Sequence, residues 1–174
     1  MEPGWYGGRV IRSCLSLVAA LSVLVLAPGA QAKLTDHTIV LGTSIGGISI
    51  GTTRAQVEQR LGHGRLLGHG RGRIENWPKL GLAFTFKGAS PLARSVAGVT
   101  NNPGYATPEG IRFGSTTADV TNAYPSLQCV GSDDINPDHP YKKCRRAGPQ
   151  GRRTEFDFDH SGDVILIAVG LASP

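Results

Sequence analysis

The chain has 174 residues, with 18 Lys and Arg against 13 Asp and Glu and a formal net charge of +5 at pH 7. Hydrophobic residues make up 40% of it, which fits a folded domain with a core rather than a disordered chain. The positive excess is too small to indicate binding to nucleic acid, so we expect no nucleic-acid partner.

The first 32 residues have the pattern of a secretory signal peptide. Two arginines precede an apolar run at 14–26, and Ala30-Gln31-Ala32 supplies the small residues of a cleavage site. The apolar run is too short to span a bilayer comfortably. We expect residues 1–32 to be removed. The remaining domain, 33–174, is expected to be secreted or associated with the cell envelope, with no transmembrane segment.

One motif then occurs twice. Residues 47–57 and 110–120 share glycine, isoleucine, threonine, alanine and valine at the same spacing, with an offset of 63 (110 − 47). Each copy predicts a short strand, a turn at a glycine and a helix that begins with a capping box. The capping boxes are expected at Thr53 with Gln56 and at Thr116 with Asp119.

Each motif is followed by alternating apolar residues that predict a hairpin. Residues 82–86 and 154–158 alternate in the same way, and Gly98 and Gly170 close the strands that follow, both with an offset of 72. The second copy therefore has about nine extra residues. Residues 164–169 are apolar on both faces, which predicts a central strand.

These elements predict an α+β fold of two tandem pseudo-repeats. Each repeat is expected to be a strand, a helix and a hairpin, with the helices packed on one face of an antiparallel sheet. Repeat 1 is expected at about 45–100 and repeat 2 at about 108–172. A repeat of this size would bury only a marginal core alone, so we expect a single domain over 33–174.

Cys129 and Cys144 are the only cysteines after residue 32. Export would place them in an oxidising compartment, so we expect a disulfide, with a metal site or a reactive thiol as alternatives. The polar run 129–151 is interpreted as a long loop that this disulfide closes. The densest basic run lies in and just after this loop, and it is either solvated or faces an anionic envelope polymer or lipid headgroups: Lys142, Lys143, Arg145, Arg146, Arg152 and Arg153.

Two patterns suggest chemistry that the rest of the sequence does not support. Ser49 lies in a G-x-S-x-G motif, but the second copy has Arg112 at that place, so we expect no enzyme. His63 and His69 have no third ligand nearby. Residues 157–162 resemble the start of a calcium loop that lacks its final glutamate. We therefore expect neither a metal nor another cofactor.

The tandem motif resembles the β-lactamase inhibitory protein-like fold, and it is similar to the SmpA/OmlA-type small lipoproteins of the outer-membrane assembly machinery. It also resembles a group of secreted actinobacterial proteins. The resemblance rests on residues 50–57 with Leu61-Gly62, and on the second copy through Tyr124. It implies helices on one face of an antiparallel sheet, an opposite face free to bind protein, and no catalysis.

The sequence thus favours a secreted, non-catalytic binding module that contacts a protein or a cell-envelope component. Trp77, Thr85, Glu155 and Asp157 are candidate contact residues on the sheet, and Lys142, Lys143, Arg145 and Arg146 are candidates in the loop. An inhibitor of a secreted hydrolase is one alternative. A small secreted serine hydrolase that acts through Ser49 is the other.

Overall fold

The computed structural model describes residues 36–67, 72–131 and 142–171. The expected signal peptide at 1–32 lies outside these residues. The structure is mostly β, with 48% strand and 15% helix, so the expected α+β class is wrong. The described strands form two antiparallel sheets, one of eight strands and one of three.

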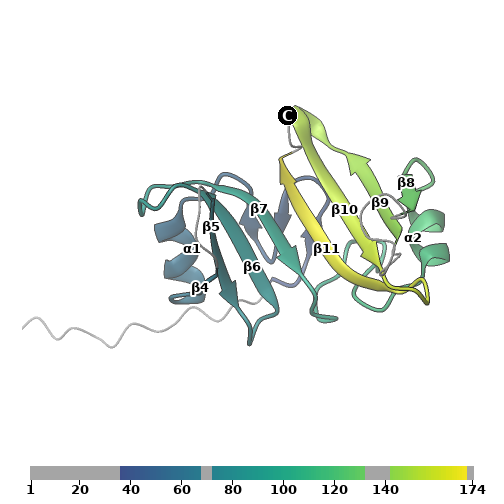
Figure 1. Ribbon diagram of the computed structural model, residues 1–174, viewed down its shortest axis with the longest axis horizontal. Coiled ribbons are helices and arrows are strands. Elements are labelled where there is room, and N and C mark those ends of the chain that lie inside the picture. The colour runs from purple at the N-terminus through teal and green to yellow at the C-terminus, as the bar shows by residue number, and fades with distance from the viewer. Residues whose placement is uncertain (1–35, 68–71, 132–141, 172–174) are drawn as a thin grey trace, which may run out of the picture. The chain divides into compact units, whose positions relative to one another are not determined.

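The large sheet has the strand order β4-β5-β6-β7-β11-β10-β9-β8 (Figure 1). Its first four strands are β4 (Arg65–Leu67), β5 (Gly72–Trp77), β6 (Leu82–Lys87) and β7 (Ser95–Thr100). Its last four are β8 (Gln128–Gly131), β9 (Lys142–Ala147), β10 (Arg152–Phe158) and β11 (Val164–Leu171). Each set of four runs as a meander, and the two meanders join where β7 pairs with β11. The prediction that residues 164–169 form a central strand is confirmed.

The small sheet consists of β1 (Ile39–Val40), β2 (Ser44–Ile45) and β3 (Ile48–Ser49). Its isoleucines Ile39, Ile45 and Ile48 are at most 1% exposed and belong to the same core as the phenylalanines of the large sheet. The sheet also bonds to the segment that leads into repeat 2, because the Ile39 amide donates to the Ala106 carbonyl at 2.8 Å. One hydrophobic core therefore draws on both repeats.

The helices are α1 (Arg54–Leu61) and α2 (Thr117–Ala123), and a short 3-10 turn, η1, covers Pro149–Gly151. Both capping boxes are present as predicted. The helices do not cover a face of the sheet. They lie near its opposite ends (Figure 1), and each buries one side chain, Val57 or Val120. Helices this short span roughly 12 Å, whereas eight strands are about 35 Å wide. This mismatch is the physical reason that the predicted layer of helices is wrong.

The repeat is larger than the predicted strand, helix and hairpin. In each copy a helix is followed by four strands, and the strand pairings align the copies residue by residue. Phe84 and Phe156 are counterparts, and both ladders carry a register shift just before the next phenylalanine, Phe86 or Phe158. All four phenylalanines are buried, as their alternation predicted.

The offset between counterparts changes along the repeat. It is 63 for the helices and for β4 and β8, then 69 for β5 and β9, 72 for β6 and β10, and 69 for β7 and β11. Repeat 2 thus has six extra residues between β8 and β9 and three between β9 and β10, but three fewer between β10 and β11, so its net excess is six residues and not the predicted nine. The predicted match of Gly98 with Gly170 is wrong, because the ladder makes Ile167 the counterpart of Gly98.

Candidate functional site

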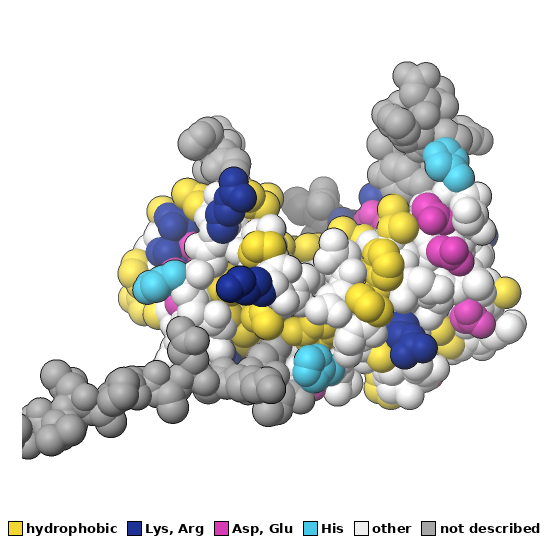
Figure 2. All heavy atoms as spheres, turned by 90° about the horizontal axis from the view of Figure 1, so that it is seen from below, with side chains coloured by type: hydrophobic (Ala, Val, Ile, Leu, Met, Phe, Trp, Pro, Cys, Tyr) yellow, Lys and Arg dark blue, Asp and Glu magenta, His cyan; other side chains and the backbone are white. Residues whose placement is uncertain are grey.

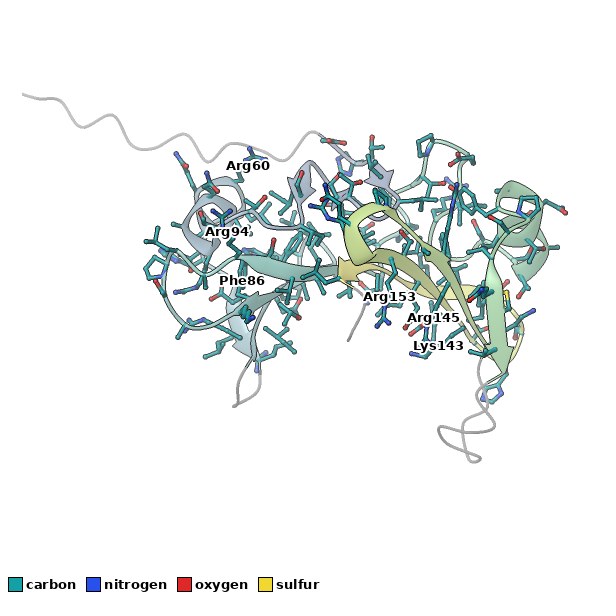
Figure 3. All side chains as sticks on the ribbon, turned by 90° about the horizontal axis from the view of Figure 1, so that it is seen from above. Arg60, Phe86, Arg94, Lys143, Arg145 and Arg153 are labelled. Atoms are coloured by element: carbon teal, nitrogen blue, oxygen red, sulfur yellow. A yellow bond between two sulfur atoms is a disulfide. The ribbon has the colours of Figure 1, made fainter. Side chains whose placement is uncertain are left out.

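The large sheet has an inner face, which packs on the core, and an outer face. Side chains alternate along each strand, so the residues between the buried phenylalanines lie on the outer face. Lys143, Arg145 and Arg153 point away from the side on which both helices lie (Figure 3). Among the described elements, no helix or strand covers the outer face (Figure 3). This face is the first candidate site.

The outer face differs in chemistry between the repeats. The ladder makes Ile74, Asn76, Ala83 and Thr85 of repeat 1 the counterparts of Lys143, Arg145, Glu155 and Asp157 of repeat 2. The first four side chains are uncharged and the second four are all charged. The same backbone positions therefore accept either set, and the fold itself does not require the charges.

The four charged residues form one ion network. Lys143 Nζ lies 3.1 Å from Glu155 Oε1 and 3.3 Å from Asp157 Oδ2, and Arg145 Nε donates to Glu155 Oε2 at 2.6 Å. The carboxylate side chains are 12% and 14% exposed, and Asp157 Oδ1 has no hydrogen-bond partner among the described residues. These charges are held in fixed positions. A ligand that binds this face must therefore present charges that are complementary to them.

Burial and neighbouring charges act differently on the two carboxylates. Burial raises the pKa of Asp157, and the lone attraction of Lys143 does not offset it. Burial also acts on Glu155, but hydrogen bonds from Arg145 and Lys143 outweigh it and lower the pKa of Glu155. Asp157 is therefore the member of the network that ionises less readily.

Four sequence-predicted contact residues, Lys142, Lys143, Arg145 and Arg146, lie on a strand and not in a loop. They are part of β9, which alternates about the buried Cys144. Lys143 and Arg145 reach the outer face, whereas Lys142 and Arg146 belong to the other face. The interpretation of 129–151 as one long loop is thus wrong, because β8 and β9 occupy most of its described part. The predicted basic patch is divided between two faces.

The two predicted contact residues of repeat 1 have different positions. Thr85 lies on the outer face between Phe84 and Phe86. Trp77 is 5% exposed, its indole Nε1 donates to the Gly62 carbonyl at 2.9 Å, and its ring contacts Phe84 edge-on. Trp77 is a core residue, and we do not retain it as a contact residue.

Cys129 and Cys144 form a disulfide between directly opposed residues of β8 and β9. Their counterparts in repeat 1 are Leu66 and Glu75, which are opposed in the same way. Glu75 is 1% exposed, and its Oε1 accepts from Arg54 Nε at 2.5 Å and from Arg73 Nε at 2.7 Å. At these positions repeat 1 has an ionic cluster, which joins α1 to the sheet through Arg54. Repeat 2 has at the same positions a disulfide, which joins β8 to β9.

A second candidate site is a recess where β9 ends and β10 begins, next to the start of β8. Its volume is about 540 Å³. Among the residues that the structure describes, no acidic residue lines it, and four arginines do: Arg145, Arg146, Arg152 and Arg153. Sequence reasoning placed all four in the densest basic run but named only the first two as candidate contact residues.

Ser49 ends β3 with an exposed side chain. Among the described residues, no hydrogen bond joins its hydroxyl to a histidine or a carboxylate. Within the same residues no group of three or more His, Cys, Asp or Glu is placed to hold a metal, and the histidines visible in Figure 2 lie apart from one another. No helix in the described part of the chain is long and apolar enough to cross a membrane.

Comparison with known proteins identifies the fold but no function. The sequence matches no protein-family model, and no curated protein matches it. The structure is similar to the crystal structure of a DUF4309 family protein, YjgB, from Bacillus subtilis, with a TM-score of 0.50 and 10% sequence identity. The similarity covers 73% of this chain and 84% of that one. At this identity the likeness shows a shared fold alone.

Proposed function

We propose that the chain is a secreted, non-catalytic binding module that contacts a protein or a cell-envelope component through the outer face. The observation that carries the proposal is the contrast between the two halves of that face. Repeat 1 builds it from uncharged side chains, and repeat 2 places a four-residue ion network at the same positions. Charges that the fold does not need are best explained by recognition.

Export is part of the proposal and has support of its own. Residues 1–32 have the signal-peptide pattern described above, and the disulfide between Cys129 and Cys144 is of a kind that persists in oxidising compartments. The resemblance to the inhibitory-protein and SmpA/OmlA-type folds, which implies a sheet face free to bind protein, points in the same direction.

The test exchanges the outer face of repeat 2 for that of repeat 1. The variant Lys143→Ile, Arg145→Asn, Glu155→Ala and Asp157→Thr carries the counterpart residue at each position. It removes two positive and two negative charges, so the net charge is unchanged. The matched control, Lys79→Gln with Lys87→Gln, removes two exposed lysines of repeat 1. Circular dichroism verifies that each variant is folded.

Immobilised 33–174 protein is then exposed to envelope and secreted fractions of the source cell. We expect saturable retention of a component by the unmodified protein and the control, and its loss from the exchanged variant. Equal retention by the exchanged variant would exclude the outer face, and no retention at all would contradict a binding function. If the retained component is a hydrolase whose activity falls on binding, the module acts as an inhibitor.

A further inference from the structure

The arginine-lined recess carries an inference beyond the outer face. Arg145 and Arg146 enter it from the end of β9 and Arg152 and Arg153 from the start of β10. Polar groups of Ser126 and Gln128 complete the lining without adding negative charge. Because side chains alternate along each strand, Arg145 and Arg153 line the recess from the outer face and Arg146 and Arg152 from the inner face. Each pair brings together two positive charges, and an anion that enters the recess reduces their repulsion.

Few of these positive charges are neutralised from within. Arg145 uses its Nε for Glu155, and Arg146 lies over the Tyr124 ring at 5.3 Å, where it also lowers the pKa of Glu109 as a minor contributor. Arg152 and Arg153 have no carboxylate within 4.0 Å among the described residues. The recess therefore retains uncompensated positive charge, most of it at the β10 side.

Repeat 1 supplies an internal reference for this recess. The ladder counterparts of its lining residues form a recess of about 390 Å³ in repeat 1. There Asn76 replaces Arg145, Trp77 replaces Arg146 and Leu80 takes the place of Arg152. The backbone builds the same hollow with Leu61, Trp77, Pro78 and Leu80 and with only two basic residues, Arg65 and Lys79, so four arginines are not needed to form it.

We propose that the repeat 2 recess binds a ligand that carries at least two phosphate groups. A guanidinium group presents a planar fork of donors that matches two phosphate oxygens, and one phosphate can accept from two such forks. Two pairs of arginines thus suit two phosphates, one at each pair, better than one small anion. The recess is large enough for both groups, and the ligand is either a soluble phosphate polymer or a set of lipid headgroups.

The test uses inorganic pyrophosphate and the 33–174 protein with its disulfide intact. Backbone amide shifts are followed by NMR at physiological salt while pyrophosphate is added. We expect saturable shifts at Gly148, Gly151 and Arg152, with little change at Lys79 and Leu80 of the counterpart recess. Arg152→Gln with Arg153→Gln should weaken binding at least tenfold. These two residues make no ion pair among the described residues, so their loss should leave the fold intact.

Controls separate phosphate recognition from general charge. Lys79→Gln with Lys87→Gln removes the same charge from repeat 1 and should change the affinity less than twofold. Binding of citrate as tightly as pyrophosphate would overturn the phosphate assignment. Shifts spread over the whole surface, or none, would overturn the site. Glycerol phosphate oligomers and phosphatidylglycerol vesicles then distinguish a soluble polymer from a lipid surface, and failure of both would contradict the inference.

This result is independent of the capture experiment. The arginine variant leaves the outer-face network of Lys143, Glu155 and Asp157 unchanged. If pyrophosphate fails to bind while the envelope component is still retained, the recess proposal fails and the proposed function stands. If pyrophosphate binds but no envelope component is retained, the recess proposal stands and the proposed function of the outer face fails.

Discussion

Glu155 and Asp157 lie two residues apart on β10, on the same face, and share Lys143. Arg145 reaches Glu155 but not Asp157, and burial together with the neighbouring charge of Glu155 acts against the ionisation of Asp157. The pKa of Glu155 is lowered in the folded protein, and the pKa of Asp157 is raised. Ionisation of Glu155 therefore stabilises the fold, whereas ionisation of Asp157 destabilises it.

The two residues should give opposite pH dependences when each is neutralised. Glu155→Gln should lower the free energy of unfolding at pH 7, and this deficit should disappear as the pH falls through the lowered pKa, where the wild-type carboxylate is protonated as well. Asp157→Asn should become more stable relative to wild type as the pH rises from 3.8, the ordinary value, through the raised folded-state pKa. Urea unfolding at several pH values measures both. Parallel curves for the two variants would contradict the assignment.

Gly98 is a glycine because of its neighbour across the strand pair. A Cβ atom at this position would lie 2.6 Å from Cε1 of Phe84, well inside van der Waals contact. We expect Gly98→Ala to lower the free energy of unfolding by about 1–3 kcal/mol, because Phe84 is buried and cannot move aside freely. Ala83→Ser on the outer face is the control, with a much smaller effect. A Gly98→Ala protein as stable as wild type in urea would show that the Phe84 ring has room to shift.

At the scale of elements, β8 is an edge strand held to β9 by the disulfide. The two cysteines are 15 residues apart, and closing a loop of that length stabilises the folded state by about 3 kcal/mol in the chain-entropy treatment. Cys129→Ala with Cys144→Ala should therefore lose about that much stability in denaturant unfolding. The matched comparison is wild type under reducing conditions, which should lose a similar amount. Loss from the alanine variant alone would assign the effect to packing.

The elements that sequence reasoning predicted correctly have local causes. Both capping boxes depend on residues three apart, and the alternation of Phe84 and Phe86 is visible within one strand. β9 escaped prediction because both of its faces are basic around Cys144, so it shows no apolar period of two. The layer of helices was wrong because sequence pattern does not specify what covers a sheet.

The candidate site was predictable only in part. The basic residues of β9 were found by their density, and Thr85 by its alternation with phenylalanines. Glu155 and Asp157 were found as polar alternates on their own strand, but only the register of β9 against β10 shows that they pair with Arg145 and Lys143. Trp77 was interpreted both as a core or rim residue and as a candidate contact, because a lone tryptophan before a proline is compatible with either, and its burial favours the core.

At the scale of the whole described chain, the two repeats should unfold together. They share the β7–β11 pairing and a core to which the small sheet contributes, and Gly42 of the segment before repeat 1 donates to Thr154 of repeat 2 at 2.7 Å. In the 33–174 protein, Trp77 is the only tryptophan, so its fluorescence reports on repeat 1 alone. Far-ultraviolet circular dichroism reports on both repeats. The two denaturant transitions should coincide. Separate midpoints would mean that the repeats are independent folding units.

The central claim is that both repeats share one backbone arrangement and differ in the side chains at counterpart positions. Exchange of side chains between the repeats tests this claim most directly. Leu66→Cys with Glu75→Cys places in repeat 1 the cysteine pair that repeat 2 carries at counterpart positions. We predict that peptide mapping of the unreduced protein will find two disulfides, Cys129 with Cys144 and the new pair with each other. Free thiols at the two new positions, or disulfides exchanged between the repeats, would contradict the claim.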